Sequence, residues 1–170
     1  MIANPGVRLD PAEHKLGRSS LVVELSAPFY TSPTRSGAEP FLESISAAAV
    51  RRYLSAENFS FHVSKANGQL AGVVVPRDNN HLFHLFVAEP YQRIHVASRL
   101  WSIVELETLA ADNPGEFTVN SSLNAVPVYE KFSFSRVGEI QYVNGICFQP
   151  MRLKGGSKEI QSTGSHGCLA

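Results

Sequence analysis

The sequence predicts an α+β fold: a mostly antiparallel central sheet with one parallel strand pair and helices on both faces. Three strand-like segments lie between residues 59 and 87 and are separated by short turns, which is typical of an antiparallel meander. Residues 82–120 then have the pattern of a strand, a long helix and a second strand, and this order favours parallel pairing of the two strands.

The N-terminal part is expected to contribute helices. Residues 1–19 contain prolines, glycines and scattered charges without a period, and we interpret them as a loose leader. Leu21–Tyr30 is compatible with a short helix. A second helical stretch is predicted at Phe41–Leu54, where apolar residues recur at helical spacing and Ser46 is a candidate N-cap.

The meander has clear strand and turn signals. Apolar and polar residues alternate over Phe59–Ser64, and the pair Asn67-Gly68 is a strong hairpin signal. Leu70–Val75 is the expected returning strand, which Pro76 is predicted to stop. His81–Val87 is the third strand and is apolar enough to be central in the sheet.

The C-terminal half alternates between helices and strands. Ala97–Asp112 has apolar residues with a period of about 3.6 and no glycine or proline, which predicts a long helix. Phe117–Val119 is a short strand, and a short helix is expected through Tyr129–Phe132. Phe134–Val143 is predicted as one long strand, joined by an Asn-Gly turn to its partner Ile146–Leu153.

The composition predicts one domain and excludes several functions. The chain has 170 residues, of which we assign 20–154 to the domain and 155–170, rich in Gly and Ser, to a flexible tail. Lys plus Arg and Asp plus Glu both number 15, so the chain has no general attraction to nucleic acid or to an anionic membrane.

The two cysteines form no zinc-type spacing, and no metal is expected. No apolar run reaches the roughly 18 residues of a membrane span, and the first residues do not resemble a secretory signal. The expected location is the cytoplasm.

The segment Val87–Trp101 has the character of an anion-binding site. An apolar strand passes through a short polar turn into the long helix, so the unpaired N–H groups of the first helical turn point at one place. These donors and the positive end of the helix dipole suit a phosphate. We interpret the turn as the binding site for the pyrophosphate of a coenzyme.

The same segment resembles the coenzyme-binding segment of the GCN5-related N-acetyltransferases (GNAT family). In that family a strand is followed by Gln or Arg, two residues, Gly, one residue, Gly or Ala, and a long helix; Gln92, His95 and Ala97 occupy these places. A second match, at residues 125–134, resembles the later family motif of an Ala, a Tyr four residues on and a Gly-Phe pair. The resemblance covers about Phe41–Leu153 and is to small, single-domain, bacterial-type members.

The resemblance implies acetyl-CoA as co-substrate, without a metal, and direct transfer of the acetyl group to an amine of a small molecule or peptide. It also implies that the parallel strands splay apart, and it is compatible with a homodimer. The implied coenzyme-binding residues are Phe86, Val87, Gln92, Arg93, Ile94, His95, Val96, Ala97, Ser98 and Asn120.

The resemblance further implies an acid for the departing thiolate. Tyr129 occupies the position of the family's general acid, and a tyrosine with a pKa of about 10 is protonated at neutral pH. His84 and Glu89 are candidates for the base that deprotonates the amine, and a water molecule would serve equally. Each of these residues also has a structural interpretation, Tyr129 as a core aromatic and the histidines as ordinary strand residues.

The chain departs from the family pattern at three positions. His95 and Ser133 replace glycines, and Ser122 stands where many members have Asn. These departures favour an alternative, a catalytically weak or inactive acyl-CoA-binding or regulatory member of the same fold. A third alternative is a hydrolase that releases CoA without an amine.

Overall fold

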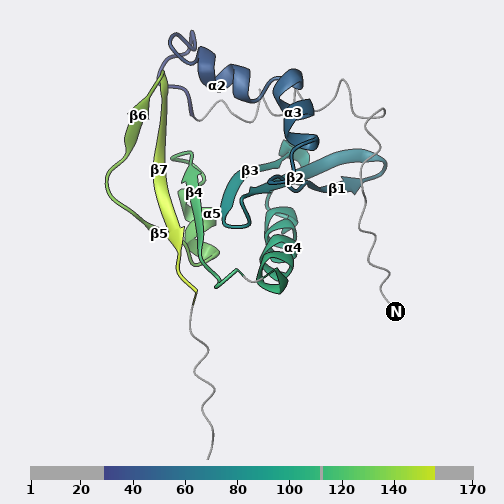
Figure 1. The fold of residues 1–170 in the computed structure, drawn as a ribbon. Coiled ribbons are helices and arrows are strands. Elements are labelled where there is room, and N and C mark those ends of the chain that lie inside the picture. The colour runs from purple at the N-terminus through teal and green to yellow at the C-terminus, as the bar shows by residue number, and fades with distance from the viewer. Residues whose placement is uncertain (1–28, 112, 156–170) are drawn as a thin grey trace, which may run out of the picture.

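The computed structural model describes residues 29–111 and 113–155, which form a mixed sheet with helices on both faces (Figure 1). The strands are β1 His62–Ala66, β2 Gln69–Arg77, β3 His81–Val87, β4 Phe117–Ser121, β5 Ser135–Arg136, β6 Gln141–Val143 and β7 Ile146–Leu153. The helices are α2 Glu39–Ser44, α3 Ala47–Leu54, the short 3₁₀ helix η2 Glu89–Tyr91, α4 Val96–Ala110 and α5 Val126–Lys131. The sheet order is β1-β2-β3-β4-β7-β5, with β6 also paired to β7. The predicted fold class is therefore confirmed.

The predicted helices mostly form. α4 matches the expected long helix, and it buries Leu100, Trp101 and Val104 against the sheet. The stretch Phe41–Leu54 forms two helices rather than one, because Ser46 caps α3: its hydroxyl accepts a hydrogen bond from the N–H of Ala49 at 3.1 Å. The leader and nearly all of the tail lie outside the described residues, as does most of the helix expected at Leu21–Tyr30.

The antiparallel meander β1-β2-β3 is confirmed, with one correction. The prediction that Pro76 stops the second strand is wrong, since β2 continues through it to Arg77. The register shifts at this point: Val75 pairs with His84 and Pro76 with Leu82, which leaves Phe83 of β3 as an extra residue. A proline, which lacks an N–H, is tolerated at such a β-bulge.

The parallel pair is confirmed, and it is open over most of its length. β3 and β4 are in register only at His81 and Thr118, where the histidine Nδ1 lies 2.7 Å from the threonine hydroxyl. The N–H of Thr118 also donates to the carbonyl of Asn80 at 2.9 Å. Beyond these contacts the two strands have no paired residues among those described, so they splay apart.

The single long strand predicted at Phe134–Val143 is wrong. The chain forms β5 and β6, two short segments that pair with different parts of β7. Gly138, between them, has a φ of +70°, which is incompatible with an extended strand. Figure 1 shows the intervening segment bowing away from β7.

Two apolar cores lie on opposite faces of the sheet. The larger core joins α4 and α5 to residues of β2, β3, β4 and β7, among them Val119 and Met151. The smaller core lies under α2 and α3 and contains Ile45, Val73 and Phe86. We call these the α4 face and the α2/α3 face.

Candidate active site

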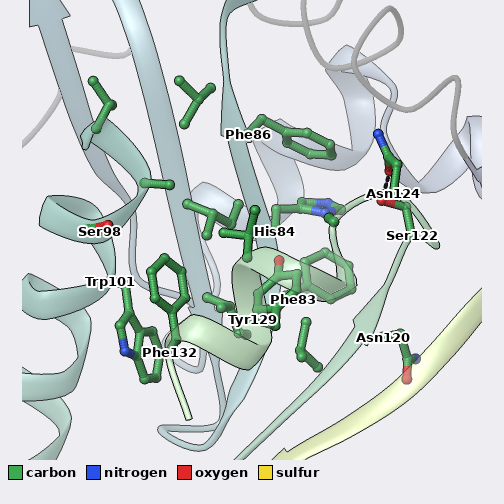
Figure 2. Close-up of a pocket in the computed structure, with 18 of the residues that line it drawn as sticks. Phe83, His84, Phe86, Ser98, Trp101, Asn120, Ser122, Asn124, Tyr129 and Phe132 are labelled. Atoms are coloured by element: carbon green, nitrogen blue, oxygen red, sulfur yellow. Dashed lines mark hydrogen bonds between the residues drawn. The ribbon is translucent and has the colours of Figure 1, made fainter. Parts of the chain in front are cut away.

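A cavity of about 1100 Å³ opens where β3 and β4 part (Figure 2). It is lined from both faces of the sheet: the turn before α4 and the side chains of α5 contribute on one side, and α2 and β7 on the other. A splayed strand pair creates such a cavity because neither strand covers the backbone edge of the other. The gap thus connects the segment that resembles a coenzyme site with the opposite face.

The turn at Gln92–Val96 leaves the start of α4 open. Arg93 and His95 have φ values of 61° and 65°, both in the left-handed region. His95 is the N-cap residue of α4, and its side chain makes no capping hydrogen bond. The first N–H groups of the helix therefore remain available to a ligand, as an anion site requires.

The left-handed conformation explains why a glycine is favoured at the His95 position. Glycine adopts a positive φ without the steric cost that a Cβ atom brings. The imidazole of His95 is exposed and the residue lines the cavity, as do Ala97 and Ser98. Ser133, the other residue in place of a glycine, has a φ of 68°, so the same explanation applies there.

Gln92 fixes the strand end next to the turn. Its Nε2 donates to the carbonyl oxygen of Val87 at 3.0 Å. The N–H of Ala88 donates to Ala71 of β2 at 2.9 Å, and backbone groups alternate in direction along a strand. The N–H groups of Val87 and Leu85 consequently face away from β2, toward the side from which β4 has departed.

Tyr129 is held in the α4-face core. It is 7% exposed, and its ring packs edge-on against Phe132 and Phe134 at centroid distances of 6.2 and 5.7 Å. No described residue accepts a hydrogen bond from its hydroxyl, which points into the cavity in Figure 2. Burial raises the pKa of Tyr129 above its ordinary value, so the hydroxyl stays protonated at neutral pH.

The two base candidates occupy different environments. His84 lines the cavity, and its Nε2 is enclosed without a hydrogen-bond partner in the described part of the chain. Burial, followed by the charge of nearby His81, lowers the pKa of His84 to about 4, against a weaker opposing effect of the Phe83 backbone. The imidazole is therefore neutral at pH 7. Glu89 is exposed on η2 and does not line the cavity.

The remaining residues expected to bind coenzyme are spread over the site. Arg93, Val96 and Asn120 line the cavity, whereas Ile94 is 52% exposed and does not. Phe86 also lines it, but from the α2/α3 face.

The family resemblance implies that the first helices and the last hairpin, Leu21–Leu54 and Phe134–Leu153, build the acceptor site, but the sequence did not identify individual side chains there. Phe29, Phe41, Ile146 and Phe148 lie there, and none of them belongs to either sequence motif. The pattern of Ile146–Leu153 indicates a strand, but it does not identify which of its side chains line a cavity.

Among residues 29–111 and 113–155, no three His, Cys, Asp or Glu side chains are grouped to hold a metal ion. The described helices include none that is both long and apolar enough to cross a membrane.

The fold and the cavity define the class as an acyl-CoA N-acyltransferase fold, and the comparisons give the family. A family model described as an acetyltransferase (GNAT) domain matches residues 29–155. The chain belongs to the GNAT family, as the sequence motifs predicted. Family membership supports an acyltransferase that uses acetyl-CoA as donor. No curated protein matches the chain.

Solved structures confirm the fold. A GCN5-related N-acetyltransferase from Rhodopseudomonas palustris is 19% identical, over 81% of this chain and 84% of that chain, with a TM-score of 0.62. The PaiA N-acetyltransferase from Thermoplasma acidophilum, in complex with coenzyme A, is 16% identical over 81% and 87%, with a TM-score of 0.63. An aminoglycoside 6′-N-acetyltransferase complexed with coenzyme A is 12% identical over 80% and 89%, with a TM-score of 0.55.

Proposed function

We propose that the protein transfers an acetyl group from acetyl-CoA directly to an amine of a small molecule or peptide. One observation carries the proposal: the cavity between the parted strands β3 and β4 is bordered by both the uncapped start of α4 and the Tyr129 hydroxyl. A single open space can thus hold an anionic coenzyme, a reacting carbonyl and a proton donor. The structural neighbour named as an aminoglycoside acetyltransferase suggests an amine acceptor by likeness of fold alone.

The turn suits the diphosphate of the coenzyme. A diphosphate carries two or more negative charges, and the N–H groups of Val96, Ala97 and Ser98 at the start of α4 lack a side-chain cap. Arg93 is exposed beside the cavity and adds a cation. Next to the turn, the free backbone edge of β3 offers N–H and C=O groups to the amide-containing arm of the coenzyme, as an added strand would.

The chemistry needs a polarised carbonyl and a proton for the leaving thiolate. The N–H of Val87, which faces the opening, can donate a hydrogen bond to the thioester oxygen as that oxygen gains negative charge. Tyr129 supplies the proton to the sulfur when the carbon–sulfur bond breaks and the new carbon–nitrogen bond forms. Its raised pKa favours the protonated form that this role requires.

The acceptor nitrogen must be uncharged when it attacks. Of the two base candidates, His84 lies in the cavity, and its neutral imidazole has a free lone pair. A pKa of about 4 makes this imidazole a weak base, so a water molecule that removes the proton remains an equal candidate. Location in the cytoplasm and assembly as a homodimer stay predictions.

Turnover with a panel of primary amines tests the proposal. Release of the CoA thiol is followed together with mass-spectrometric detection of the N-acetylated amine. We expect one acetylated amine for each CoA released, and no release without amine. Release without amine would indicate a hydrolase. Binding of acetyl-CoA without turnover of any amine would favour the regulatory alternative.

A further inference from the structure

We propose that the cavity on the α2/α3 face accepts a primary amine with one charge, attached to an aromatic or other apolar body, in preference to a polyamine or an aminoglycoside. This inference rests on the proposed function, because it names the acceptor class for the same site. Three features carry it: the rings that line this face, the distribution of charge around the cavity, and one enclosed nitrogen.

The α2/α3 face of the cavity is built from aromatic and aliphatic side chains. Phe41 of α2 packs against Phe29 with a centroid distance of 5.4 Å. Met151 of β7 lies in the α4-face core, so Ile146 and Phe148, which have the opposite parity on that strand, point to the α2/α3 face. All four of these apolar residues line the cavity.

β3 adds rings to the same face. His84 and Phe86 extend from the strand to one side in Figure 2, and their ring centroids lie 5.3 Å apart. The bulge at Phe83 brings that ring to 4.2 Å from His84. Such a surface gains free energy by covering a flat apolar group.

The charges around the cavity oppose a polycation. Within the part of the chain that the structure describes, Glu105 of α4 is the sole carboxylate residue in the cavity lining, and it lies on the α4 face. On the α2/α3 side, Arg77 places its guanidinium 5.3 Å from the centroid of the Phe83 ring. Arg77 is paired with Asp78 at 3.0 Å, and Asp78 does not line the cavity. A second ammonium group would therefore enter this side of the cavity without a carboxylate in the described lining to pair with, and desolvating such a charge is costly.

A single amine has a partner in His84. Its Nε2 is enclosed and has no hydrogen-bond partner in the described part of the chain. In the tautomer with its proton on Nδ1, this nitrogen is a hydrogen-bond acceptor beside the Phe86 ring. An N–H of a single amino group can donate to this nitrogen, while the apolar body of the acceptor lies against the rings.

Direct binding tests the inference independently of catalysis. Phenethylamine and spermidine are titrated separately into the full-length protein, both without and with CoA. NMR chemical-shift changes or calorimetric heats of binding give the dissociation constants. We expect phenethylamine to bind at least about tenfold more tightly than spermidine. Equal or tighter binding of spermidine, or no binding of phenethylamine at millimolar concentration, would overturn the inference.

A variant pair locates the binding. Phe148→Ala should weaken phenethylamine binding about tenfold and leave acetyl-CoA binding unchanged. Phe148→Leu, which keeps an apolar side chain, should weaken phenethylamine binding less. The control is Tyr142→Ala, which removes a ring that is 69% exposed on β6 and should change neither. If folded Phe148→Ala binds phenethylamine as tightly as the unchanged protein does, the inference is contradicted. If the unchanged protein does not bind acetyl-CoA, the proposed function alone is contradicted.

Discussion

The two faces of the β3–β4 opening are built by different means. On the α4 face the site is largely backbone: an uncapped helix start, two left-handed turn residues and the free edge of β3. On the α2/α3 face it consists of side chains from segments distant in sequence, among them Phe41, Phe86 and Phe148. A site made of backbone holds any ligand with the common diphosphate, whereas a site made of side chains can be specific. The first suits a shared coenzyme, and the second suits a particular acceptor.

The largest effect is expected at the point where the two faces meet. Tyr129→Phe removes the hydroxyl and keeps the buried ring, so kcat should fall by about 100- to 10,000-fold while the affinity for acetyl-CoA changes little. Steady-state kinetics and a binding titration measure the two quantities. Tyr142→Phe, on the exposed strand β6, is the matched control. A loss of less than about threefold would show that Tyr129 is not the acid.

The second effect concerns the enclosed imidazole of His84 on the α2/α3 face. Because the pKa of His84 is lowered from 6.5 to about 4, the unfolded chain binds a proton there before the folded chain does. The free energy of unfolding should therefore fall by up to about 3 kcal/mol as the pH drops from 6.5 to 4. His81, whose pKa burial also lowers, contributes in the same direction.

Denaturant unfolding between pH 7 and pH 4, with His84→Gln as the comparison, measures this contribution. The variant should show a flatter pH dependence, because it lacks the group that takes up the proton. An identical slope in both proteins would mean that His84 is not held neutral by the fold.

The third effect tests the site on the α4 face, which is built largely from backbone groups. Ala97→Glu places a carboxylate in the first turn of α4, where it stabilises the helix but repels a diphosphate. The dissociation constant for acetyl-CoA should rise about 10- to 100-fold, while the melting temperature is maintained. Leu106→Glu makes the same charge change on the same helix at a side chain that is 70% exposed, and should leave binding unaltered. Equal effects of the two variants would place the coenzyme elsewhere.

The smallest effect lies in the turn itself. His95→Gly removes the cost of a Cβ atom at a φ of 65°, and should raise the free energy of unfolding by about 1 kcal/mol. His95→Ala retains that cost while removing the imidazole. Chemical denaturation of both variants separates the backbone from the side chain. If Ala stabilises as much as Gly, the imidazole and not the φ angle is responsible.

The same contrast explains what the sequence could predict. The turn before α4 depends on the contiguous segment Val87–Trp101, whose strand, turn and helix signals are local, so this order of elements could be predicted from the sequence. Two predicted elements were wrong, one because of a distant segment and one because of a backbone conformation within the segment itself. Pro76 continues β2 because Phe83, on the next strand, supplies the bulge. Phe134–Val143 is divided because Gly138 takes a positive φ. No spacing in the sequence could place Phe41 and Phe148 at one cavity.

Titration of acetyl-CoA into the full-length protein by calorimetry tests the central claim most directly. We expect one site per chain with a dissociation constant of about 1 mM or lower. Ala97→Glu should weaken this binding, and Phe148→Ala should leave it unchanged. A melting curve of the same preparation shows whether the protein is folded. If folded protein does not bind acetyl-CoA at millimolar concentration, the proposed coenzyme site is contradicted.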